Sequence, residues 1–178
     1  MKTRQVVIFS GHKFKVPEHI QRIDSRSTHG WQLRYGPSKM YSDGTPDGKG
    51  ARAALALAVA ELKKRIGKLQ APTGLQRDPS ANKTSDLPVG ISGPILRQRK
   101  DRKVPECSFS VLLPRYGKTP LRRSIYIGNQ NTYTVPRYEA ALARALEMRK
   151  EAEEAYQRDV TRAKRVRSEE HTSELQSH

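Results

Sequence analysis

The chain has 178 residues, a formal net charge of +16 and a mean hydropathy of −0.79, and 35% of its residues are hydrophobic. This length suits one ordinary domain or two small ones, and the composition is too polar for one large core. No apolar run approaches the roughly 18 residues of a membrane span, and the run at residues 6–9 is too short for a secretory signal. The single Cys107 excludes an internal disulfide framework. We therefore expect a cytoplasmic protein with an anionic partner.

The last twelve residues, RSEEHTSELQSH at positions 167–178, match the translation of a common sequencing adapter. We interpret them as an artefact of library preparation and leave them out of the fold reasoning. They contain one Arg and three Glu, so their removal raises the formal charge to +18 over 166 residues. The natural sequence beyond Val166 is then unknown.

An N-terminal segment, residues 1–17, precedes a first predicted module at residues 18–67. Three short strands are expected at residues 19–24, 30–36 and 39–42, and residues 43–50 read as a loop. In the second of these strands hydrophobic and polar side chains alternate, which is typical of a half-buried strand. The side chains predicted to face inward are Trp31, Leu33, Tyr35 and Met40, and those predicted to face outward are Gln32, Arg34, Lys39 and Tyr41.

A helix is predicted over residues 50–67, which are rich in alanine. Its hydrophobic residues Leu55, Val59, Leu62 and Ile66 have the spacing of a single helix face. Gly67 is the expected C-cap. Residues 68–86 hold several Pro, Gly, Ser and Asn residues without periodicity, so they read as a linker.

A second predicted module spans residues 87–158 and repeats the order of three strands and one helix. The strands are expected at residues 87–93, 109–113 and 122–128, and the helix at about 135–158, before a basic tail at 159–166. In the third strand Arg123, Ile125 and Ile127 would share one face, and Arg122, Ser124 and Tyr126 the other. In the helix either Met148 or Arg149 would join the buried stripe. The predicted fold is therefore α+β, with two tandem modules that each pack a three-stranded antiparallel sheet on one Ala-rich helix.

Catalytic and metal-binding motifs are weak. Gly117-Lys118-Thr119 looks like the end of a phosphate-binding loop, but that motif needs a glycine where Leu112 stands. The segment at residues 43–48 lacks the ligand spacing of a calcium loop. The carboxylates and histidines show no spacing for cleavage or nucleophilic chemistry. We expect no enzymatic activity, no metal, no cofactor and no small-molecule substrate.

The charge points to nucleic acid. The sequence pI is about 10.3, and residues 97–103 hold five cations: Arg97, Arg99, Lys100, Arg102 and Lys103. Basic surfaces of this kind bind phosphates. A sheet backed by a helix leaves its other face free, and a pair of strands fits the DNA major groove. Arg and Gln on such a face can read guanine and adenine edges.

Both modules resemble the Apetala/ethylene-response-factor (ERF) type of DNA-binding domain in its bacterial and phage form. The resemblance rests on LPVGIS at residues 87–92, RSIYIG at 123–128 and Tyr138 with the alanine-rich helix at 140–145. In the first copy it rests on residues 20–24, 30–34 and 41–44 and on the alanines at 51–60. It implies a sheet that docks in the major groove through Gln21, Gln32, Arg34, Lys39, Tyr41, Ser92, Ser124 and Tyr126.

The sequence departs from the plant members of this family at the first strand. Gln21 and Ile23, and then Ser92 and Pro94, occupy positions where the plant members carry arginines. The basic loop at residues 97–103 is unaffected by this departure, and we expect it to contact phosphates.

The expected function is sequence-influenced binding of double-stranded DNA by a nucleoid-associated regulator or a phage or mobile-element accessory factor. Two alternatives stay open at this point. The first is an RNA-binding or ribosome-associated protein, because an exposed tyrosine on a basic sheet would also suit single strands. The second is a protein whose basic face meets an acidic protein.

Overall fold

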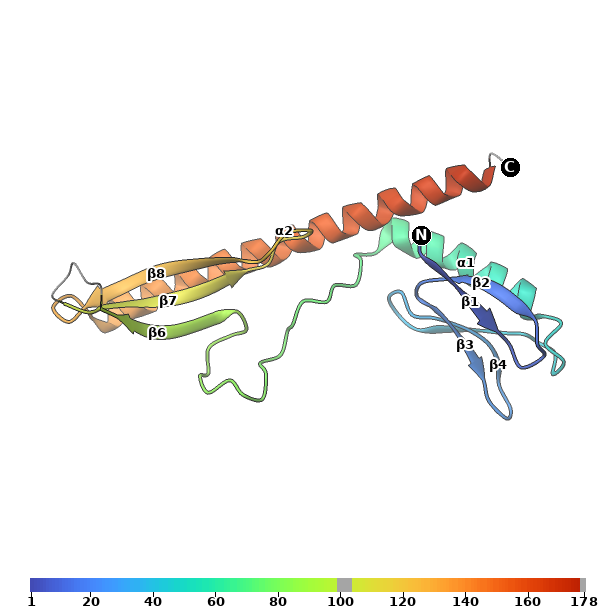
Figure 1. Ribbon diagram of the computed structural model, residues 1–178, viewed down its shortest axis with the longest axis horizontal. Coiled ribbons are helices and arrows are strands. Elements are labelled where there is room, and N and C mark those ends of the chain that lie inside the picture. The colour runs from blue at the N-terminus through green and yellow to red at the C-terminus, as the bar shows by residue number, and fades with distance from the viewer. Residues whose placement is uncertain (99–103, 177–178) are drawn as a thin grey trace. The chain divides into compact units, whose positions relative to one another are not determined.

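The computed structural model describes residues 1–98 and 104–176, with side chains described as far as residue 170 (Figure 1). In these residues the fold is α+β, as predicted, with eight strands in three antiparallel sheets and two helices. The chain divides into two compact units. The first comprises Met1–Pro72 and Val160–His178, and the second comprises Thr73–Asp159.

The first unit begins with a hairpin of β1 (Thr3–Val7) and β2 (Lys13–Pro17), to which the sequence reasoning assigned no strands. Val16 is fully buried, and the Phe14 ring meets Trp31 edge-on at 5.6 Å between ring centroids. The hairpin therefore adds its apolar side to the core of the first unit.

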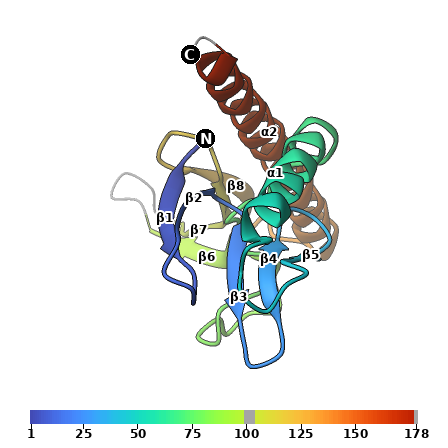
Figure 2. The same ribbon diagram turned by 90° about the vertical axis from the view of Figure 1, so that its right-hand side faces the viewer.

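The main sheet of this unit has the order β3-β4-β5, with β3 at Ile20–Asp24, β4 at His29–Leu33 and β5 at Lys39–Ser42. Helix α1 (Ala51–Lys68) covers one face of it (Figure 2). Trp31 and Leu33 are fully buried in one cluster with Leu55, and Trp31 Nε1 donates a hydrogen bond to the Ala51 carbonyl at 2.8 Å. The three strands, the helix and the inward positions of Trp31, Leu33 and Tyr35 are as predicted. The expected C-cap is wrong, because Gly67 lies within the helix and Leu69 caps it.

A buried ion network joins β3 to the end of β5. The Arg22 guanidinium donates to both carboxylate oxygens of Asp43, at 2.8 and 2.6 Å, and to Asp24 at 2.9 Å. Only 6% of the Arg22 side chain and 1% of the Asp43 side chain is exposed. Arg22 also lies over the Trp31 ring, 4.9 Å from its centroid. This pairing satisfies a charge that burial alone would strongly disfavour.

The second unit holds the sheet β6-β7-β8, with β6 at Ile91–Arg97, β7 at Glu106–Leu113 and β8 at Leu121–Asn129. One face packs on the first turns of α2 (Val135–Gln176). Its buried cluster contains Ile91, Cys107, Phe109, Val111, Ile125, Ile127, Ala141 and Ala145. Ile125 and Ile127 thus face the helix as predicted, whereas Arg123 is exposed.

Helix α2 is longer than predicted, because it continues past residue 158 to Gln176. Residues 159–166 contain no Gly or Pro that would end it. From Val160 onward the helix belongs to the first unit. There the Thr161 hydroxyl accepts a hydrogen bond from the Ala71 amide at 3.1 Å, and Lys164 pairs with Glu18 at 2.9 Å. The first unit is therefore built from two separate stretches of the chain.

Arg149 is the less expected member of the buried stripe on α2. Only 8% of it is exposed, and Met148 beside it is partly buried against the same core. Its guanidinium donates to the Leu112 carbonyl and pairs with Glu153 one turn later. Gly90, beside the same guanidinium, has a φ of 82°, a left-handed conformation that residues with a side chain rarely adopt, so this position favours glycine. Met148 and Arg149, the two alternatives of the sequence-based prediction, therefore both contribute to the buried side of α2.

Candidate nucleic-acid interface

The face of the second sheet that points away from α2, here called the second free face, is built around serines. Ser92, Ser110 and Ser124 are direct cross-strand partners on β6, β7 and β8. The next row consists of Ile95, Ser108 and Tyr126, after a bulge on β6 between Ser92 and Ile95. Serine side chains are short, and each hydroxyl can both donate and accept a hydrogen bond. The centre of this face is therefore low and polar.

Arginines stand at opposite ends of the second free face. Arg97 pairs across the ladder with Glu106 at one end, and Arg122 pairs with Leu112 at the other. Both arginines are exposed. The Tyr126 side chain is 51% exposed, with its hydroxyl 3.5 Å from Thr132 Oγ1. This face carries two cations, the carboxylate of Glu106 and one aromatic ring around a centre of hydroxyl groups.

The orientation of this face follows from strand alternation. Phe109 and Val111 on β7 are fully buried against α2, so Ser108 and Ser110 point the other way. Five predicted site residues meet on the second free face: Ser92, Arg97, Arg122, Ser124 and Tyr126. The sequence reasoning missed Ser108 and Ser110 as site residues, although the period of two around Phe109 and Val111 was the signal that could have found them.

The corresponding face of the first sheet, here called the first free face, is less charged. Gln21 and Gln32 are cross-strand partners, and Met40 on β5 is the partner of Gln32 on its other side. The Gln32 carbonyl oxygen accepts a hydrogen bond from Arg34 Nε at 2.8 Å, and its amide nitrogen donates to Ser38 Oγ at 3.0 Å. These bonds hold Gln32 in one orientation, and they engage the Nε of Arg34 rather than its terminal nitrogens.

Three residues of β5 face the opposite way from the prediction. Tyr41 pairs with buried Trp31 and packs against the core, whereas Met40 lies on the first free face with 37% exposure. Lys39 shares the face of Tyr41, and its ammonium nitrogen lies 5.2 Å from the centroid of that ring. Because Asp43 bonds to the buried Arg22, the alternate residues 41 and 39 point to the same side. The expected outward positions of Lys39 and Tyr41, and the inward position of Met40, are wrong.

The remaining predicted cations fall in a part of the chain without described coordinates. Arg99, Lys100, Arg102 and Lys103 lie outside the described residues, in the segment that joins β6 to β7. Of the described site residues, Arg34 is the cation of the first free face, and Arg97 and Arg122 are those of the second. On the second free face the Glu106 carboxylate, the cross-strand partner of Arg97, offsets one of these two positive charges.

Within the described part of the chain, no cluster of three or more His, Cys, Asp or Glu side chains could hold a metal ion. Nor does any helix there combine the length and apolarity needed to cross a membrane. Comparisons with family models, curated proteins and solved structures found no match to this chain.

Proposed function

We propose that the two units carry tandem copies of one Apetala/ERF-like module and that the protein binds double-stranded DNA through the two free faces. The observation that carries this proposal is the serine-centred second free face, flanked by Arg97 and Arg122, on the side of the sheet opposite α2. The protein would act as a regulator or accessory factor in bacterial or phage DNA transactions.

The dimensions of the sheet support docking in the major groove. Strands lie about 4.8 Å apart, so three of them span roughly 10 Å. The major groove of B-DNA is about 12 Å wide. Short side chains at Ser92, Ser110 and Ser124 would let the sheet approach the base edges closely. Their hydroxyls can bond to either bases or phosphates.

The other site residues supply reading and positioning. Arg34, held through its Nε by Gln32, would present its terminal nitrogens to a guanine edge. The basic segment at residues 97–103 would neutralise phosphates regardless of sequence. Two linked modules would bind more tightly than either alone, because the second binding event becomes intramolecular.

The test is duplex binding measured by fluorescence anisotropy over a series of salt concentrations. The double variant Arg122→Ala/Tyr126→Ala should weaken binding at least about tenfold, because it removes a charged and an aromatic contact. The matched control is Lys150→Ala/Tyr156→Ala on α2, which removes one cation and one tyrosine away from the second free face. Equal affinities of the two double variants would contradict the proposal.

Single variants separate base reading from phosphate binding. Arg34→Ala should change the order of preference among duplex sequences, whereas Arg99→Ala should weaken all of them alike. Both effects are read from binding to a randomised duplex pool followed by sequencing of the bound fraction. An unchanged sequence preference in Arg34→Ala would show that Arg34 on the first free face does not read bases.

One observation favours RNA as a second candidate. Tyr126 is half exposed beside small serines, and a ring in this setting can stack on an unpaired base, which is worth about 1–3 kcal/mol. Competition between a duplex and single-stranded RNA of the same length decides between them. Preferential binding of the RNA, abolished by Tyr126→Ala, would replace the DNA proposal.

A further inference from the structure

We propose that the groove between the segment at residues 76–85 and the edge strand β6 holds the phosphate backbone of one DNA strand. This inference rests on the proposed function, because it adds a phosphate-binding site at the edge of the second free face. The juxtaposition that carries it is a line of hydroxyl and amide side chains facing Ser92 across an open groove.

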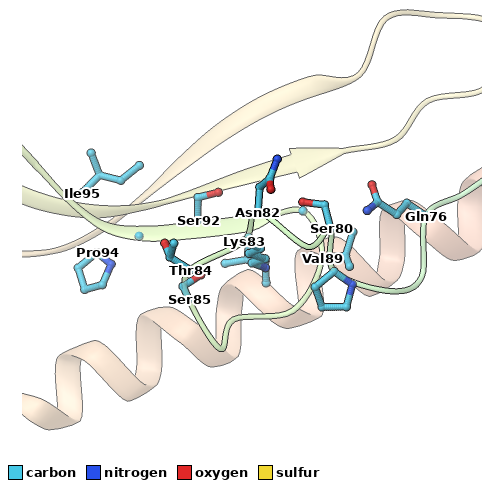
Figure 3. Close-up of a pocket in the computed structure, with 14 residues that line it drawn as sticks. Gln76, Ser80, Asn82, Lys83, Thr84, Ser85, Val89, Ser92, Pro94 and Ile95 are labelled. Atoms are coloured by element: carbon cyan, nitrogen blue, oxygen red, sulfur yellow. The ribbon is translucent and has the colours of Figure 1, made fainter.

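The groove has a volume of about 520 Å³, and polar side chains line much of it. Figure 3 shows Ser92 and Ile95 on β6, with Ser80, Asn82, Thr84 and Ser85 on the facing segment. None of the described lining residues is acidic, although Asp78 and Asp86 lie elsewhere in the same stretch of chain. Hydroxyl, amide and ammonium groups are the ones that contact phosphate oxygens in protein–DNA complexes.

Lys83 holds the facing segment in place and brings a positive charge to the groove. Its ammonium group donates to the carbonyl of Leu87 and to that of Pro88, the latter at 2.6 Å. Its backbone amide donates to the Ser80 carbonyl at 2.9 Å. An ammonium group has three donors, so these two bonds leave one for a ligand. The segment is thus folded on itself before any DNA arrives, which lowers the entropy cost of binding.

The location of the groove matches the place where a phosphate backbone would pass. A sheet roughly 10 Å across nearly fills a major groove about 12 Å wide, so its edge strands lie close to the two walls. Those walls are the two phosphate backbones. β6 is an edge strand, and Ser92 and Ile95 belong both to the second free face and to the groove. DNA docked on the serines would therefore bring one backbone to the groove beside β6.

The test changes one charge at a time in the full chain. Asn82→Asp places a negative charge in the groove with little change in shape, and Asn82→Lys places a positive one. Lys150→Gln and Glu147→Gln on the exposed side of α2 change the net charge by the same amounts and serve as controls. Binding of a short mixed-sequence duplex is measured for each protein, together with the thermal midpoint, which should stay constant because Asn82 is exposed.

We expect Asn82→Asp to bind the duplex about fivefold to tenfold more weakly than Lys150→Gln, and Asn82→Lys to bind more tightly than Glu147→Gln. The slope of log affinity against log salt should steepen by about one for Asn82→Lys. Duplexes with single methylphosphonate linkages should identify a position whose neutralisation weakens the wild type but not Asn82→Asp.

Two negative results are distinguishable. If the wild type binds and Arg122→Ala/Tyr126→Ala weakens it, but the Asn82 variants bind like their controls, the groove proposal is wrong and the proposed function stands. If the wild type does not bind duplex at low salt, or binds single-stranded RNA in preference, the proposed function fails and the groove proposal fails with it.

Discussion

Arg22 and Asp43 illustrate how single residues hold the first unit together, because their ion pair lies inside the protein and links two strands of one sheet. Removal of one partner of such a pair leaves a buried charge without its full complement of bonds. Asp24 alone would then face the Arg22 guanidinium. The geometry also aligns β5, so the pair determines which side chains reach the first free face.

We expect Asp43→Ala to lower the free energy of unfolding by about 3 kcal/mol, measured by urea denaturation. The control is Asp47→Ala, which breaks the surface ion pair with Lys49 and should hardly change stability. A similar loss in both variants would show that the buried ion pair contributes no more to stability than the surface pair.

Asp24 makes the stability of the first unit depend on pH. Burial acts to raise the pKa of Asp24, but hydrogen bonds from Arg22, His29 and the Phe9 amide outweigh it and hold the pKa below its ordinary value of 3.8. A carboxyl with a lowered folded pKa stabilises the protein above its unfolded pKa, and this contribution disappears as the pH falls through the folded pKa.

The free energy of unfolding should therefore decrease as the pH falls below about 4, and less steeply in Asp24→Asn than in the wild type. Urea denaturation at several pH values between neutrality and the acid limit measures this difference. Parallel pH profiles for the two proteins would contradict the assignment.

Among the elements, β7 is the centre of the second free face, because it is the middle strand of its sheet and carries Ser108 and Ser110. If a flat centre is needed for docking, a large side chain there should interfere with DNA and not with folding. Ser110→Phe should weaken duplex binding about tenfold or more, with a free energy of unfolding within about 0.5 kcal/mol of the wild type. The comparison is Ala143→Phe on the exposed side of α2, which keeps the net charge and should bind normally.

Alternation predicted most elements of both sheets. Trp31 and Leu33, and then Ile125 and Ile127, are separated by single residues and face the core as expected. The same rule failed for β5, because Met40 and Tyr41 are adjacent and either of them could be buried. A partner outside the strand determines which of the two faces the core. That partner is the Arg22–Asp43 pair, which involves residues 21 positions apart. Pairings of this separation are not visible in local periodicity.

The hairpin of β1 and β2 was missed for a different reason. Phe14 and Val16 alternate with lysines in the pattern of a half-buried strand, but the first strand has a single partly buried residue, Val6. The predicted end of α2 at about residue 158 is too early, since the basic stretch at residues 159–166 continues the helix. In the chain a helix continues until a residue that disfavours it, and none occurs there.

The two units differ in which stretches of the chain supply their residues. The second unit is one continuous stretch, Thr73–Asp159, and its buried cluster uses only its own residues. The first unit draws on Met1–Pro72 and on the last part of α2. The two units should therefore respond differently to truncation.

A fragment of residues 73–159 should unfold cooperatively by itself, whereas residues 1–72 alone should be less stable than the same unit in the full chain. The full-length variant Thr161→Val tests the second statement directly. It removes the hydroxyl that accepts a hydrogen bond from the Ala71 amide. We expect it to lower the free energy of unfolding of the first unit by about 1–3 kcal/mol, measured by urea denaturation. A fragment 1–72 as stable as the unit in the full chain would contradict this view.

The divided origin of the first unit also affects the order of events during synthesis. Chains grow from the N-terminus, and domains usually complete their folding in that order. Here the ribosome releases every residue of the second unit before it releases Val160, so the later unit can finish first. The earlier unit must wait with its hairpin and β3–β5 sheet already outside the exit tunnel. A nascent chain that has emerged from the tunnel only as far as residue 159 would carry a complete serine face and an unfinished first unit.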